Sequence, residues 1–164
     1  IPKHTVPDIG IDISAGKFKL GDGSYGNVDT ELSAGTLTIG NIDCRNLKCD
    51  MSAGNINIAG ANCEIFDLDV SAGSVNISEM ICNSSTDINL TAGSANVTNF
   101  ECPKIAIDVS AGDVNLGFTD KEENYTISVD KSAGSCNVGD RTSNTGKSIK
   151  IDISAGKVIC NFQD

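Results

Sequence analysis

The residues of this sequence that could do chemistry are its cysteines and its acids. Four of the seven cysteines recur at intervals of 19 or 20 residues, at Cys44, Cys63, Cys82 and Cys102. A second periodic series is acidic except for one Asn: Asp12, Glu31, Asp50, Asp69, Asn89, Asp108, Asp130 and Asp152. Thiols can form disulfides or bind metal ions. Carboxylates can bind calcium or act in pairs as the acid and base of glycoside hydrolysis.

Other catalytic groups are scarce. The one histidine is His4, so no Ser-His-Asp or Cys-His constellation can be assembled. We expect His4 to be a solvated tail residue. The segment 21–26 matches G-x-G-x-x-G, but a strand pattern follows it where a dinucleotide site needs a helix. The segment 144–148 is similar to the end of a phosphate loop, but Arg141 stands where the first Gly is required.

A tripeptide repeat positions both series. Ser-Ala-Gly, once Thr-Ala-Gly, begins at Ser14, Ser33, Ser52, Ser71, Thr91, Ser110, Ser132 and Ser154. The intervals are 19, 19, 19, 20, 19, 22 and 22 residues, too short for a pair of packed helices. They fit one turn of a β-solenoid.

Apolar and polar residues alternate on both sides of each tripeptide, as in Ile11-Asp12-Ile13 and Ile56-Asn57-Ile58. A period of two predicts strands with one buried face. We expect the Gly to occupy a corner at positive φ and the preceding Ala to fill the inside of that corner. Two further Gly- or Asn-containing points in each repeat predict three short strands and three corners per turn.

The predicted fold is therefore all-β. It is a single-stranded, right-handed β-helix of about eight triangular coils of 19–22 residues, with parallel strands stacked in register. We expect one domain over residues 1–164, in which residues 1–10 lead in and the repeats occupy residues 11–162.

In this fold the four periodic cysteines lie one above another on the inside of the third strand. Their side chains point the same way, which suits a disulfide poorly although the Cα separation permits one. Metal binding needs converging ligands, and the sequence has no Cys-x-x-Cys motif and no Cys–His pair. The favoured interpretation is a stack of small buried hydrophobes with free thiols.

The acidic series becomes an outward row. Carboxylates ~5 Å apart repel by about 1 kcal/mol per neighbouring pair even in water. Calcium, hydrogen bonds from nearby hydroxyls and amides, or solvation could offset this repulsion. The candidate calcium ligands are Asp50, Asp69 and Asp108, and no residue is assigned to catalysis or to a cofactor. We expect a second outward row to hydrogen-bond amide to amide: Asn57, Asn76, Asn96, Asn115 and Asn137.

The regularity breaks near the C-terminus. The two 22-residue intervals carry extra polar residues at 117–124 and 140–148, which predict bulging loops. Lys131 takes an inward position and predicts a distorted seventh coil. Neither end shows a helical cap, and we expect an excised domain from which a leader or anchor has been removed.

Composition narrows the function classes. The chain has 164 residues, a formal net charge of −10 and seven aromatic residues, five Phe and two Tyr. The charge disfavours nucleic acid and anionic membranes as partners, and the few aromatics disfavour a base-stacking platform. No apolar run approaches the ~18 residues of a membrane helix.

The repeat Asp-x-Ser-Ala-Gly-x-Val-x-Ile, traceable from Ile11 to Cys160, resembles that of a bacterial family described as adhesins, of uncharacterised function. The resemblance implies a single-stranded β-helix at the cell surface or envelope, often tethered by a segment outside the repeats. It supplies no catalytic residues.

We therefore predict a non-enzymatic module of the bacterial cell envelope or surface, an adhesin or scaffold without cofactor that binds a glycan or protein. The alternatives are a calcium-assisted, polysaccharide-acting β-helix enzyme and a self-assembling structural solenoid. We expect a monomer or weak end-to-end association, no nucleic-acid partner, and no insertion of this segment into a membrane.

Overall fold

The structure is a computed structural model that describes residues 6–164. It is nearly all β, with 65% of the chain in strands. The one helical element in this range is the short 3-10 helix η1 (Glu122–Asn124). The strands are β1 (Ile9–Ile13), β2 (Lys17–Leu20), β3 (Gly23–Ser24), β4 (Asn27–Leu32), β5 (Thr36–Asp43), β6 (Asn46–Met51), β7 (Asn55–Val70), β8 (Ser74–Ile77), β9 (Met80–Leu90), β10 (Ser94–Glu101), β11 (Lys104–Val109), β12 (Asp113–Phe118), β13 (Tyr125–Lys131), β14 (Ser135–Cys136), β15 (Lys147–Ile153) and β16 (Lys157–Asn161). His4 lies outside the described residues.

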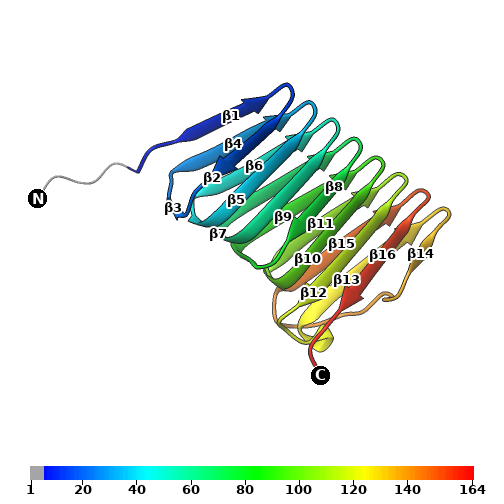
Figure 1. The fold of residues 1–164 in the computed structure, drawn as a ribbon. Helices are drawn as coiled ribbons and strands as arrows, with labels where there is room; N and C mark the ends of the chain where they lie inside the picture. The colour runs from blue at the N-terminus through cyan, green and yellow to red at the C-terminus, as the bar shows by residue number, and fades with distance from the viewer. Residues whose placement is uncertain (1–5) are drawn as a thin grey trace, which may run out of the picture.

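The strands form a β-solenoid of about eight turns, which confirms the predicted fold class (Figure 1). All pairings between the named strands are parallel. The strands that precede the tripeptides stack as one wall: β1, β4, β6, the end of β7, the end of β9, β11, β15 and β13. The strands that follow them stack as a second wall: β2, β5, the start of β7, β8, β10, β12, β16 and β14. The first wall begins at Ile9, two residues inside the predicted lead-in.

The prediction of three short strands per coil is wrong for the middle of the solenoid. β5 continues through the second predicted corner, β9 through the third, and β7 through both. These corners are bends within strands, because a gentle bend keeps the backbone hydrogen-bonded to the neighbouring coils. A register shift between Cys63 and Ile65 marks one bend and takes up the extra residue of the 20-residue interval.

The Ser-Ala-Gly segments lie between the strands of the two walls. Their eight glycines have positive φ, from 102° to 158°. The Ala before each Gly is exposed in all eight repeats, so the expectation that it fills the inside of a corner is wrong. The chain reverses there through a glycine conformation that breaks the in–out alternation of a strand. The segments still bond to the next coil, since Thr36 N–H donates to the Gly16 carbonyl at 2.8 Å.

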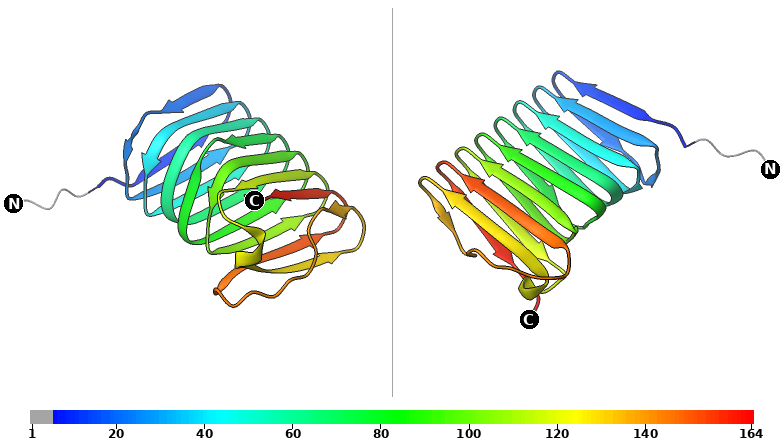
Figure 2. Two further views of the ribbon diagram at one scale, coloured as in Figure 1. Left: turned by 90° about the horizontal axis from the view of Figure 1, so that it is seen from below. Right: turned by 180° about the vertical axis from the view of Figure 1, so that it is seen from behind.

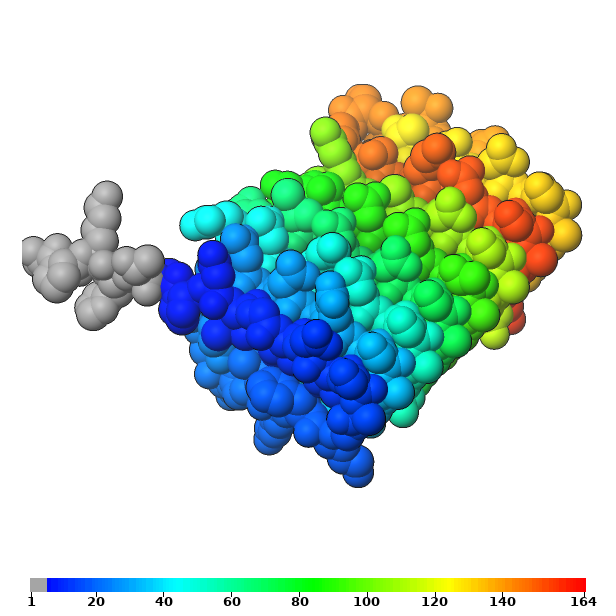
Figure 3. Space-filling view, turned by 90° about the horizontal axis from the view of Figure 1, so that it is seen from above, coloured from blue at the N-terminus to red at the C-terminus, as the bar shows by residue number. Residues whose placement is uncertain are grey.

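The last two coils do not stack in chain order. β15 lies between β11 and β13, and β16 lies between β12 and β14. The eighth coil is thus inserted between the sixth and the seventh, and the seventh coil ends the solenoid. In Figure 3 the red residues of the eighth coil separate the yellow-green sixth coil from the yellow and orange seventh.

The two extended intervals explain this insertion. The segment with η1 connects the sixth coil to the seventh and leaves room for one coil between them. The segment 137–146 then leads the chain back into that space, as Figure 2 shows at the C-terminal end. From the seventh coil to the eighth, the chain still winds around the solenoid axis in the same sense, but it moves back along that axis. The turn that joins these two coils therefore has the opposite hand to the others. Lys131 is exposed because its strand is the terminal one, facing Ile153 on a single side. The end is blunted by this charge.

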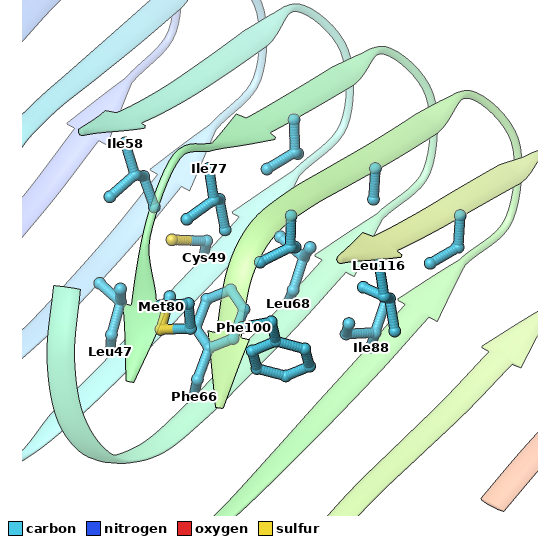
Figure 4. Packing of buried hydrophobic residues seen from close by; sticks show 14 of the residues in the cluster. Leu47, Cys49, Ile58, Phe66, Leu68, Ile77, Met80, Ile88, Phe100 and Leu116 are labelled. Carbon is cyan, nitrogen blue, oxygen red and sulfur yellow. The ribbon is translucent and has the colours of Figure 1, made fainter. Parts of the chain in front are cut away.

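The core is one continuous cluster of inward-pointing hydrophobic side chains that runs along the inside of the solenoid. Figure 4 shows part of it. Toward the C-terminal end it becomes aromatic. The Phe118 ring stacks on Phe162 with centroids 4.5 Å apart and lies 5.4 Å from Phe100 and 5.6 Å from Tyr125. This cluster joins the sixth, seventh and eighth coils, so it secures the inserted coil.

Candidate functional site

The outer surface of the first wall, which we call the acidic face, carries two parallel rows of charge. The row two residues before each tripeptide runs in space as Asp12, Glu31, Asp50, Asp69, Asn89, Asp108, Asp152 and Asp130. The neighbouring row, four residues before each tripeptide, contains Asp29, Lys48, Asp67, Asp87 and Lys150. Together the rows hold ten acids and two lysines. The second row was visible in the repeat alignment, but sequence reasoning did not single it out.

Some of this charge is balanced within the face. Lys48 Nζ lies 3.3 Å from Asp50 Oδ2, and Lys150 Nζ lies 3.3 Å from Asp152 Oδ2. The pKa of Lys48 is raised, first by its hydrogen bond to Asp50 and then by the negative charge of the Asp50 carboxylate. Asp67 shows the opposite situation, because burial and then the charge of Asp87 raise the pKa of its carboxyl. The face therefore retains a net negative charge that would favour a cation.

The three candidate calcium ligands are not brought together. Asp50 and Asp69 are direct neighbours in adjacent strands. Asp108 is separated from Asp69 by the rung that carries Asn89. Within residues 6–164, no three His, Cys, Asp or Glu side chains form a group that could hold a metal ion. Calcium binding at these residues stays a prediction.

The Asn row lies on the second wall, and part of it forms the expected amide ladder. Asn96 Nδ2 donates to Asn76 Oδ1 at 3.2 Å, and Asn115 Nδ2 donates to Asn96 Oδ1 at 2.9 Å. Asn137 does not join this ladder, because the inserted coil places Ile159 between it and Asn115. Its amide instead bonds to the backbone of Cys160, at 2.8 Å in both directions.

The four periodic cysteines form a column on the third side of the coils, which we call the cysteine ladder. Cys63 faces Cys82 directly in adjacent coils. The strand pairing ends one residue before the other two contacts, at Asp43 opposite Asn62 and at Glu101 opposite Ile81. Continuing this register by one residue places Cys44 opposite Cys63 and Cys102 opposite Cys82. Cys44 is half-buried and the other three are buried. All seven cysteines of the chain are free thiols.

The thiols of the ladder are oriented by nearby acceptors. Cys82 Sγ donates to the carbonyls of Ser85 and Glu64, at 2.9 and 3.1 Å. Cys102 Sγ lies 3.1 Å from its acceptor, the Lys104 carbonyl, and accepts a hydrogen bond from Thr86 Oγ1 at 3.3 Å. Interactions with the side chains of Cys102 and then Cys63 lower the pKa of Cys82, against the opposing effect of burial. Bonding to its neighbours raises the pKa of Cys63.

The cysteines outside the ladder differ from it. Burial raises the pKa of Cys49 to about 12 and that of Cys160 to about 12. Neither faces another cysteine: Cys49 pairs with Thr30 and Leu68, and Cys160 pairs with Leu116. These positions fit the interpretation of Cys as a small hydrophobe.

A shallow hollow on the third side is lined by Glu79, Ile81, Asn99, Glu101 and Thr119. Asn99 has a φ of 48°, the one non-glycine residue with positive φ among the described residues, and its amide donates to the Ser78 carbonyl at 3.1 Å. Asn99, which lines the hollow, lies within the register shift between Val97 and Phe100. The hollow is open to solvent, and its acidic residues are Glu79 and Glu101.

Comparison with known proteins adds one finding. A family model described as Toastrack DUF4097 matches residues 1–159, almost the whole chain. No curated protein and no solved structure matches the chain. Within residues 6–164, no helix has the length and apolar character needed to cross a membrane.

Proposed function

The chain belongs to the Toastrack DUF4097 family, and we propose that it is a non-catalytic module of the bacterial cell envelope or surface. A β-solenoid of this family fits a structural or scaffold role. We propose in addition that it acts as an adhesin-like binding module whose acidic face receives a basic segment of a protein ligand.

The acidic face is the observation that carries this proposal. Its ten acids stand in two straight rows, and in-register strands repeat each row at about 4.8 Å. Charge arranged in this way steers an oppositely charged partner and suppresses acidic ones. A basic protein segment is therefore favoured over an acidic glycan and over nucleic acid.

The catalytic alternative has less support. A polysaccharide-acting enzyme would use Asp50, Asp69 and Asp108 with calcium, yet Asn89 interrupts the row and Lys48 pairs with Asp50. Calcium-dependent cleavage of a polysaccharide by the purified chain would favour that alternative over ours.

The test is solid-phase binding of the full chain to panels of extracellular matrix proteins and glycans. The face variant Asp50→Asn/Asp69→Asn/Asp108→Asn should lose binding to its protein ligand. The control variant Asp43→Asn/Glu79→Gln/Glu101→Gln removes the same charge from exposed acids of the third side and should bind normally. Equal loss in both variants, or binding unaffected by either, would refute the assignment to this face.

The panel also tests the remaining expectations. Binding should weaken as salt is raised, because exposed charges are screened beyond ~8 Å at physiological ionic strength. Size-exclusion chromatography over a range of concentrations should give a monomer or a weak, concentration-dependent dimer. Long filaments would instead support a self-assembling solenoid, since β1 and β14 each pair with only one strand of the solenoid.

A further inference from the structure

The cysteine ladder is a column of free thiols that the binding proposal does not use. Four thiols lie in one column, one in each of four consecutive coils, and Cys63 and Cys82 are ladder partners. Elsewhere in the core, Cys shares its column with Leu, Val or Thr. Only in this column does each thiol have another thiol as its neighbour on the next rung.

The spacing of the rungs decides which bond the thiols can form. Parallel strands lie ~4.8 Å apart, and side chains at paired positions keep about that separation. A disulfide is compatible with this spacing of the Cα atoms, but it needs the two side chains turned toward each other, whereas stacked side chains point the same way. A linear S–M–S bridge with metal–thiolate bonds of ~2.3 Å, as for zinc, spans about 4.6 Å between the sulfurs. The ladder therefore matches a two-coordinate metal ion better than a disulfide.

The lack of a three-residue metal cluster is compatible with this match, because a linear site needs two ligands. Soft thiolate ligands select Cu(I), zinc and iron–sulfur clusters. Zinc in structural sites takes four ligands in a tetrahedron, so a site of two opposed thiolates favours Cu(I). Hard, oxygen-preferring ions such as Ca²⁺ and Mg²⁺ are poorly suited to sulfur. The backbone carbonyls of Glu64, Ser85 and Lys104 accept hydrogen bonds from the thiols of the ladder. These bonds orient the sulfur atoms and leave the space between adjacent coils free.

We propose that the cysteine ladder binds Cu(I) in two linear bis-thiolate sites, Cys44–Cys63 and Cys82–Cys102. Each site forms by 2 RSH + Cu⁺ → [RS–Cu–SR]⁻ + 2 H⁺, so two S–H bonds are replaced by two S–Cu bonds without any change in oxidation state. Half-buried Cys44 gives the ion a point of entry at the end of the ladder.

The test compares two double variants that remove the same number of thiols. In Cys63→Ser/Cys102→Ser the remaining ladder thiols, Cys44 and Cys82, are two rungs apart and cannot share an ion. In Cys44→Ser/Cys63→Ser the remaining pair, Cys82 and Cys102, is still adjacent. A third variant, Cys49→Ser/Cys160→Ser, removes two buried thiols outside the ladder.

Each protein is titrated anaerobically with Cu(I) against a chromogenic Cu(I) chelator, with thiolate-to-copper absorption and proton release recorded in parallel. The wild type and the Cys49/Cys160 variant should each take up two ions. The adjacent-pair variant should keep one, and the alternating variant none in competition with the chelator. Far-UV circular dichroism shows whether each apo-variant is folded before titration.

The proposal is overturned if the alternating and adjacent-pair variants bind the same number of ions. It is also overturned if uptake falls only in the Cys49/Cys160 variant, or if the wild type binds nothing. Because the acidic face is untouched in all three variants, ligand binding on the panel should be unchanged. Failure of the copper site is thus distinguishable from failure of the proposed function.

Discussion

Replacing Gly54 with Ala should destabilise the protein much more than the same replacement at Gly16. Both glycines have a φ that other residues rarely adopt, +117° at Gly54 and +108° at Gly16. Backbone strain of this kind costs about 1–3 kcal/mol and should be common to both variants. The difference between them isolates the contact between stacked coils.

That contact is present at Gly54 and absent at Gly16. A Cβ on Gly54 would lie 2.3 Å from the carbonyl oxygen of Gly35 and 2.9 Å from its nitrogen. A Cβ on Gly16, in the first coil, would meet nothing within 4 Å. The clash is with backbone, which cannot rotate away, and the same Gly35 carbonyl accepts the Asn55 N–H. Relief requires the two coils to separate.

The size of the effect follows from the bonds that must open. Losing two or three hydrogen bonds between coils, at about 1 kcal/mol each, adds about 2–3 kcal/mol to the strain. Because 1 kcal/mol shifts Tm by about 2–4 °C in a domain of this size, Gly54→Ala should melt about 4–12 °C below Gly16→Ala. Thermal melts followed by circular dichroism measure this difference. Equal melting temperatures would refute the close stacking of these corners.

Three further predictions concern charge and the C-terminal end. Burial and the charge of Asp87 raise the pKa of Asp67, so its stabilising contribution is lost as pH rises through that pKa; Asp67→Asn should raise Tm at pH 7 but not below the ordinary carboxyl pKa of 3.8. Asp120 behaves oppositely: burial acts to raise its pKa, but hydrogen bonds from Lys147 and Asn124 lower it overall. Its contribution is present above pH 3.8 and lost as pH falls through the lowered pKa, so Asp120→Asn should lower Tm at pH 7 and converge with the wild type in acid. Phe118→Ala should cost about 3–5 kcal/mol by opening the aromatic cluster, and hydrogen exchange should show the loss confined to the last three coils.

The sequence predicts the coils well because each repeat carries its own pattern. The tripeptide spacing gives the register, and the alternation separates inward from outward residues, so that Asp50 and Asp69 stand side by side as predicted. Cys63 and Cys82 are neighbours for the same reason. The prediction failed at the alanines because the extended strand ends before them: Ser, Ala and Gly all lie in the bend between the two walls, where the in–out alternation of a strand does not apply.

The order of the last coils could not be predicted from the repeats. All coils offer compatible edges, so the pattern around Asp108 accepts Asp152 as well as Asp130 as its neighbour. The observed order is stabilised by contacts between residues far apart in the sequence. The aromatic cluster and the Lys147–Asp120 ion pair join the eighth coil to the end of the sixth coil and to the loop that follows it. The inward Lys131 was the available signal, since a charged residue there is tolerable only at an open end.

The binding role of the acidic face can be tested directly by chemical-shift mapping of the isotope-labelled full chain with hexalysine as the probe. We predict shifts confined to the amides of the first wall, from β4 to β11, that weaken as salt is added and vanish in the Asp50→Asn/Asp69→Asn/Asp108→Asn variant. Shifts on the Asn row or at the solenoid ends, or undiminished binding by that variant, would contradict the account.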